Sequence, residues 1–266
     1  MDGADPSVTD DGGRTALLYA AVNGCKKLVR ILIEHGPAGL VSCETADGES
    51  ALYVACGSGH LGVAKILIKA GGKESVFTGM NGFTCLHMAC QEGHLAIVKT
   101  LIEQGGEALL LSTSKDGYSC LHIACQYGHL EIVKSLTEAG GEALLRMTTN
   151  GGISCLVAAC QFGYLEIVTF LIEAGGEALL QITTNEGYSC LIPACQNGFL
   201  EIVKALIEAG GEALLFKKTK DGSSCLDVAG QYGHLEIVKV LVEAGGEELL
   251  FMSKSTLPPW RVGIRR

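Results

Sequence analysis

The sequence predicts an all-α fold, a solenoid of stacked helix pairs, and three observations support this prediction. The pattern Gly-x-[Ser/Thr]-[Cys/Ala]-Leu recurs seven times in the 266 residues. Successive patterns are 34 or 35 residues apart, with the Leu at Leu17, Leu52, Leu86, Leu121, Leu156, Leu191 and Leu226. Apolar residues then recur at helical spacing after each pattern. A regular period of this length is typical of units that bury their apolar faces only against one another.

The unit at residues 116–150 shows how each repeat is expected to begin. Its first residues, DGYS, predict a tight turn, and Ser119 is placed to cap the helix that follows. The next segment, CLHIACQYG, predicts a short helix of small and apolar residues that ends at Gly128. In the sixth unit this short helix contains Pro193, close enough to its start to be tolerated.

A longer helix and a return loop complete the unit. The segment HLEIVKSLTEAGG predicts a helix whose inner side carries Leu130, Ile132, Val133 and Leu136. The two glycines are expected to end this helix, and the segment EALLRMTT to return the chain to the next turn. The resulting boundaries are 10–45, 46–79, 80–114, 115–149, 150–184, 185–219 and 220–252 for the repeats, and 253–266 for a basic tail.

The order of turn, short helix, longer helix and return loop, with the sequence SCLHIACQYGHLEIV, resembles the ankyrin repeat. The family's signature is T-P-L-H-x-A-A-x-x-G-H-x-x-I-V, and the resemblance covers roughly residues 10–252. It implies an ankyrin-type repeat solenoid, with a β-turn and two antiparallel helices in each unit. It also implies that His87 and His122 bond the backbone of adjacent turns.

Two features depart from the family pattern. The return loop is about two residues longer, because GGEALL replaces the usual Gly-Ala-Asp segment. The family's Pro is replaced by Ala16, Ala51, Cys85, Cys120, Cys155, Cys190 and Cys225.

The spacing of Cys120, Cys125 and His129 is similar to the start of a zinc site. At about 100° per helical residue, however, the two cysteines lie roughly 140° apart and cannot face one ion. Equivalent cysteines in neighbouring units are separated by about 8–10 Å, beyond the 4.4–6.8 Å or so that a disulfide tolerates. The resemblance places all three residues at packing positions. We therefore expect neither metal nor disulfide, and a thiol-based redox or metal sensor is the weaker alternative.

Composition and motifs restrict the function. The net charge of −9 opposes binding to nucleic acid or an anionic membrane, and no apolar stretch is long enough to span a bilayer. Twelve cysteines without a secretory signal favour a reducing compartment, the cytoplasm or the nucleus. No catalytic motif or phosphate-binding loop is present, so we expect no enzyme activity and no cofactor.

The resemblance leaves two sets of positions free for binding: those beside the turn glycine and the pair that precedes the glycine between the helices. We expect a monomer that binds another protein on its concave face, because exposed aromatic side chains are typical interface anchors. The candidate contact residues are Phe83, Tyr118, Tyr127, Ile153, Phe162, Tyr188 and Tyr232. Two alternatives are that these residues only pack on adjacent turns, and that the chain is a structural or targeting segment of a longer protein.

Overall fold

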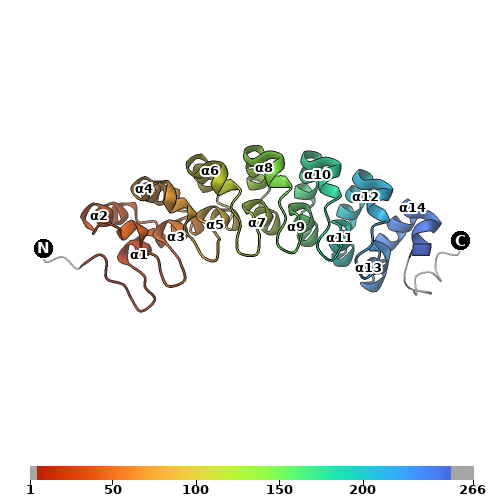
Figure 1. Ribbon diagram of the computed structural model, residues 1–266, viewed down its shortest axis with the longest axis horizontal. Coiled ribbons are helices and arrows are strands. Elements are labelled where there is room, and N and C mark those ends of the chain that lie inside the picture. The colour runs from red at the N-terminus through yellow and green to blue at the C-terminus, as the bar shows by residue number, and fades with distance from the viewer. Residues whose placement is uncertain (1–4, 253–266) are drawn as a thin grey trace. The chain divides into compact units, whose positions relative to one another are not determined.

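The computed structural model describes residues 5–252, and all regular structure in that range is helical apart from isolated β-bridges at the turns (Figure 1). The prediction of an all-α fold is therefore confirmed. The expected basic tail lies outside the described residues, and the repeat boundaries stay predictions. The chain divides into two compact units, Met1–Leu144 and Leu145–Arg266.

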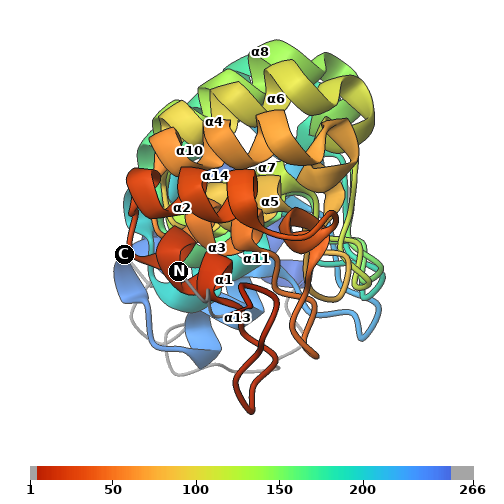
Figure 2. The ribbon, with the colours of Figure 1, turned by 90° about the vertical axis from the view of Figure 1, so that its left-hand side faces the viewer.

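The first unit contains short helices that alternate with longer ones. The short helices are α1 (Ala16–Val22), α3 (Ala51–Gly57), α5 (Cys85–Gln91) and α7 (Cys120–Tyr127). The longer helices are α2 (Lys26–His35), α4 (Leu61–Gly71), α6 (Leu95–Leu110) and α8 (Leu130–Leu145), with 3-10 turns η1 (Leu40–Ser42) and η2 (Lys73–Phe77). Each of α1, α3 and α5 packs on the longer helix that follows it and on the next short helix. Figure 2 shows α2 and α4 on one side of α1 and α3.

The second unit has the same alternation. Its short helices are α9 (Cys155–Phe162), α11 (Leu191–Asn197) and α13 (Cys225–Gln231). Its longer helices are α10 (Leu165–Leu180), α12 (Leu200–Leu215) and α14 (Leu235–Met252). The helix α11 packs between α9 and α13, and α12 packs between α10 and α14, so short and long helices form separate layers (Figure 1).

Local capping and burial explain the short helices. The Ser119 side chain accepts a hydrogen bond from the backbone N–H of His122 and begins α7, as the sequence predicts. Within this helix Leu121 and Cys125 are fully buried. Burying a leucine side chain contributes roughly 1.5–3 kcal/mol, more than helix propensity adds per residue, so packing holds these short helices together.

The prediction that GGEALL forms a return loop is wrong, because the chain forms another helical turn there. Gly141 is non-helical, with φ 52° and ψ −145°, and residues on both sides of it are helical. The turn after the kink buries Leu144 and Leu145. Apolar burial and helix-forming residues therefore outweigh the interruption by glycine. The same kink occurs at Gly106, Gly176, Gly211 and Gly246.

Three cysteines at the family's Pro position, Cys120, Cys155 and Cys225, contact this extra helical turn. Cys155 donates to the Leu145 carbonyl (3.7 Å) and Cys225 to the Leu215 carbonyl (3.5 Å). At these three positions the two departures noted in the sequence are therefore one structural feature. The longer return segment brings a carbonyl to the start of the next short helix, and a thiol there can donate to it.

Cysteines at different positions of adjacent repeats also contact each other, as Cys90 does with Cys120. The distance expected between equivalent cysteines does not predict these contacts. Burial raises the pKa of the Cys90 thiol well above its ordinary value, and a hydrogen bond with Cys120 raises it further. Burial and Cys225 raise the pKa of Cys195 in the same way. Thiols of this kind stay protonated at neutral pH and are poor nucleophiles and poor metal ligands.

Candidate partner-binding site

Three of the predicted contact residues lie in the first unit. Phe83 and Tyr118 precede α5 and α7 and are half-buried. Their rings lie on imidazoles: Phe83 is 5.3 Å from His87, and Tyr118 is 6.2 Å from His122 in an edge-on arrangement, both measured between ring centroids. Tyr127 ends α7 and is 45% exposed. Phe83 and Tyr118 therefore have a packing role as well as exposed surface.

The other four lie in the second unit. Ile153 and Tyr188 occupy the turns before α9 and α11, Phe162 ends α9, and Tyr232 caps the end of α13. Phe162, Tyr188 and Tyr232 are 44%, 44% and 52% exposed. Aromatic rings this exposed contribute little to the core and are available for contact.

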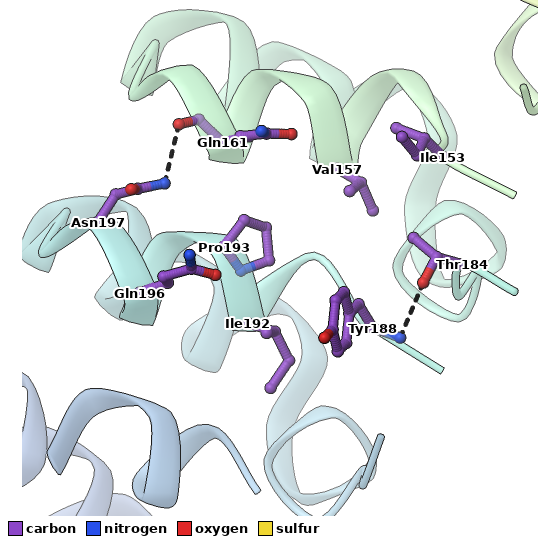
Figure 3. Close-up of a pocket in the computed structure, with 9 residues that line it drawn as sticks. All are labelled: Ile153, Val157, Gln161, Thr184, Tyr188, Ile192, Pro193, Gln196 and Asn197. Carbon is purple, nitrogen blue, oxygen red and sulfur yellow. Dashed lines mark hydrogen bonds between the residues drawn. The ribbon is translucent and has the colours of Figure 1, made fainter. Parts of the chain in front are cut away.

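Ile153 and Tyr188 line one depression between the two short helices, here called the α9–α11 hollow (Figure 3). It has a volume of about 240 Å³. The first wall, from α9 and the turn before it, consists of Ile153, Val157 and Gln161. The second wall, from α11 and its turn, consists of Thr184, Tyr188, Ile192, Pro193, Gln196 and Asn197. Phe162 and Tyr232 do not line it.

Backbone and side-chain hydrogen bonds fix the rim of the hollow. The Tyr188 N–H donates to the Thr184 hydroxyl (3.0 Å), which holds the turn, and the Asn197 amide donates to the Gln161 carbonyl (3.1 Å) (Figure 3). Gln196 donates to the hydroxyl of Tyr232 (3.2 Å). These bonds order the polar edge before any partner binds.

Sequence reasoning missed the residues that shape the hollow. It selected exposed aromatic rings, whereas the hollow depends on Val157, Pro193 and Asn197. No other repeat has Val at the first of these positions or Pro at the second, and only the first repeat, with Asn23, has Asn at the third. The available signal was the departure of two neighbouring repeats from most of the others, the fifth at Val157 and the sixth at Pro193 and Asn197.

The residues described contain no cluster of three or more His, Cys, Asp or Glu side chains suited to a metal ion. Among the same residues, no helix is both long and apolar enough to cross a membrane. His87 bonds the backbone of the adjacent turn, as the resemblance implies: its Nε2 lies 3.0 Å from the Tyr118 carbonyl oxygen.

Comparison with known proteins agrees with this architecture. A family model described as ankyrin repeats (3 copies) matches residues 1–76, 69–147, 86–181 and 156–250. Among solved structures, the crystal structure of the human ASB11 ankyrin repeat domain is similar, with a TM-score of 0.71 and 25% sequence identity. The match covers 86% of this chain and 98% of that one.

Proposed function

Because this chain belongs to the ankyrin repeat family, we propose that it is a non-enzymatic scaffold that binds a partner protein on the concave face of its repeats. Ankyrin repeats are general protein–protein interaction modules. The observation that supports a site on this chain is the exposure of aromatic rings at the turns and at the ends of the short helices. Such rings lose little conformational entropy on binding and are typical interface anchors.

The proposed contact residues are Phe83, Tyr118, Tyr127, Ile153, Phe162, Tyr188 and Tyr232. The net charge of −9 favours a protein partner over nucleic acid, since a polyanion would be repelled. The chain is expected to act as a monomer in the cytoplasm or the nucleus. The protonated, buried thiols speak against a redox sensor, because such thiols react slowly.

A double substitution tests the proposal once affinity capture and cross-linking have identified a partner. Tyr118→Ala with Phe162→Ala removes one candidate ring from each compact unit. We expect the affinity for the purified partner, measured by calorimetry, to fall by about tenfold or more, because truncated anchors cost about 2 kcal/mol each. The circular dichroism spectrum and melting curve should stay nearly unchanged.

The matched control is Phe251→Ala, which removes a ring that is 79% exposed in α14, a helix of the other layer. It should leave binding unchanged. Wild-type affinity in the double variant would contradict the proposed site, and unfolding of the double variant would show that the rings only pack.

A further inference from the structure

Histidines join neighbouring repeats at one recurring position, and the sixth repeat lacks this residue. His60, His94 and His234 place Nε2 2.8, 3.0 and 3.0 Å from the carbonyl oxygens of Val22, Gly57 and Gln196. The sixth repeat has Phe199 there. Its ring occupies the place of the imidazole, since a Cβ added to Gly163 would lie 2.6 Å from it, as one added to Gly24 would lie 2.7 Å from His60.

The phenyl ring of Phe199 cannot donate a hydrogen bond to the carbonyl oxygen that an imidazole binds at this position in other repeats. The carbonyl of Gln161 instead accepts from the side-chain amide of Asn197 at 3.1 Å. Asn197 stands where the fourth, fifth and seventh repeats have Tyr127, Phe162 and Tyr232, whereas the first three repeats have Asn23, Ser58 and Glu92. Compared with the repeats on either side, which have Phe162 and Tyr232, the amide leaves less bulk at this edge of the hollow.

The floor of the hollow departs from the repeat pattern as well. Val157 stands at the position of His87 and His122. In the third repeat the imidazole lies against Phe83 and reaches the carbonyl of the next turn. Val157 is smaller and apolar, so space remains between it and Tyr188, and both line the hollow.

Pro193 completes the floor and makes it rigid. In the fifth repeat the Ala158 N–H donates to the Ser154 carbonyl (3.0 Å), but proline has no N–H. The Ser189 carbonyl accepts from the Ile192 N–H instead (3.2 Å), and α11 begins at Leu191. Because the φ angle of Pro193 is fixed, this part of the backbone loses little conformational entropy when a ligand binds.

We propose that the α9–α11 hollow is an anchor pocket for one uncharged apolar side chain, of leucine or phenylalanine size, carried by an extended segment of a partner protein. This proposal rests on the proposed interaction function and names its most specific contact. The volume of about 240 Å³ is below the 300–1,000 Å³ or so of sites for whole small ligands, and suits a side chain.

The chemistry of the walls selects the kind of side chain. No Asp, Glu, Lys, Arg or His lines the hollow, so a charged anchor would lose hydration without gaining a partner. Gln161 and Gln196 lie on its two walls and can each donate to and accept from a peptide backbone. Adjacent helices are about 8–10 Å apart, a distance that an extended chain covers in about three residues. An extended segment can therefore reach both amides around one anchor.

The test fills the hollow with residues that this chain already uses at the same positions. Asn197→Tyr copies Tyr127 and Tyr232, and Val157→His copies His87 and His122, so both variants should fold. The control is Ser58→Tyr, which places the same side chain at the equivalent position of the second repeat. Circular dichroism and melting curves of all three variants establish that they are folded.

The probe is a library of random short peptides displayed on phage and selected against the wild-type chain. We expect the enriched peptides to share one leucine or aromatic residue without charged immediate neighbours. Measured by fluorescence anisotropy, their affinity should fall by about tenfold or more in Asn197→Tyr and in Val157→His and stay unchanged in Ser58→Tyr. Replacing the shared peptide residue by Ala should weaken binding to the wild-type chain. The same replacement should lower the affinity for the Asn197→Tyr variant only slightly further, because the pocket is already filled there.

An empty selection, or peptides that bind both filled variants as well as wild type, would overturn the anchor pocket. That failure is separate from failure of the proposed function. If the native partner binds the filled variants normally but loses affinity for the chain with Tyr118→Ala and Phe162→Ala, the scaffold function stands without this pocket. If the partner binds all variants equally, the proposed contact residues are wrong as well.

Discussion

The thiol of Cys120 donates a hydrogen bond to the carbonyl oxygen of Leu110, at a distance of 3.3 Å. This bond joins the start of α7 to the helical turn that follows the glycine kink of α6. Cys120 is fully buried, and a thiol is a weak donor. Burial of the side chain is therefore the larger part of what it contributes to stability.

Replacing Cys120 by Ala should lower the free energy of unfolding by only about 1 kcal/mol, as expected for loss of a small buried group. The first two repeats already have Ala16 and Ala51 at this position. Urea denaturation measures the change, with Cys43→Ala, at an exposed site, as the control. A loss of several kcal/mol would mean that the thiol has a role beyond packing and its hydrogen bonds with Leu110 and Cys90.

Chelation should have no effect on the purified protein. Cys120 and Cys125 are both buried residues of α7. The region described shows no group of His, Cys, Asp or Glu side chains suited to a metal. Melting curves with and without a strong chelator should coincide, and elemental analysis should find no stoichiometric zinc. Unfolding on chelation would identify the thiols and His129 as ligands, because structural zinc sites contribute directly to folding.

Pro193→Ala should raise the melting temperature. The new N–H could donate to the Ser189 carbonyl, as Ala158 does to Ser154, and such a bond contributes about 1 kcal/mol. Loss of proline makes the unfolded chain more flexible and offsets about 0.4–1 kcal/mol of this gain. We therefore expect a rise of at most a few degrees.

The reverse change, Ala158→Pro, is the matched control because it removes the equivalent bond from the fifth repeat. It should lower the melting temperature. A lower melting temperature for Pro193→Ala would show that the proline stabilises α11 where it stands.

The repeat period was sufficient to predict the paired helices, because cap and core residues such as Ser119 and Leu121 act locally or against the next repeat. The turn after Gly141 was missed because two successive glycines are typical of a helix end, and only burial of Leu144 shows that the chain continues as helix. The half-burial of Tyr118 depends on its contact with His122, which no exposure pattern in the sequence reveals.

The hollow could not be predicted for a different reason. It is formed where Val157 and Asn197 are smaller than the His87 and His122, or the Tyr127, Phe162 and Tyr232, that several other repeats have at these positions. A prediction from the residues present selects rings such as Tyr188 and overlooks the space beside them. Whether a small residue leaves space depends on whether its neighbours move in, and this is decided by packing across two repeats.

Acid should destabilise the protein through His87. Burial lowers the pKa of His87 to about 4 from an ordinary 6.5, with His122 adding to the depression and the bond to the Tyr118 carbonyl opposing it. Between these two values the unfolded chain binds the proton and the folded chain does not. Stability due to the neutral imidazole is therefore complete above about pH 6.5 and declines as the pH falls toward 4, by up to about 3 kcal/mol.

Urea denaturation at several pH values between 7 and 4 measures this decline. His87→Val, which copies Val157 of the fifth repeat, should be less stable at pH 7 because it loses the bond to Tyr118. Its stability should fall less steeply with acid than that of the wild type. Parallel pH profiles for the two proteins would contradict the assignment to His87.

The last prediction separates two glycines of the final repeat by backbone conformation alone. A Cβ added to Gly233 or Gly246 meets no atom within 4 Å, so neither substitution causes a clash. Gly246 has φ 58° and ψ −157°, a region that is essentially restricted to glycine. Gly233, with φ 78°, stands where Gly163 and Gly198 adopt the left-handed conformation that Asn tolerates. Gly246→Asn should therefore cost about 1–3 kcal/mol in urea denaturation, and Gly233→Asn should cost clearly less. Equal losses would mean that the kink in α14 can relax into an ordinary helix, in which case the Gly-Gly pair would not be what sets the return of the chain.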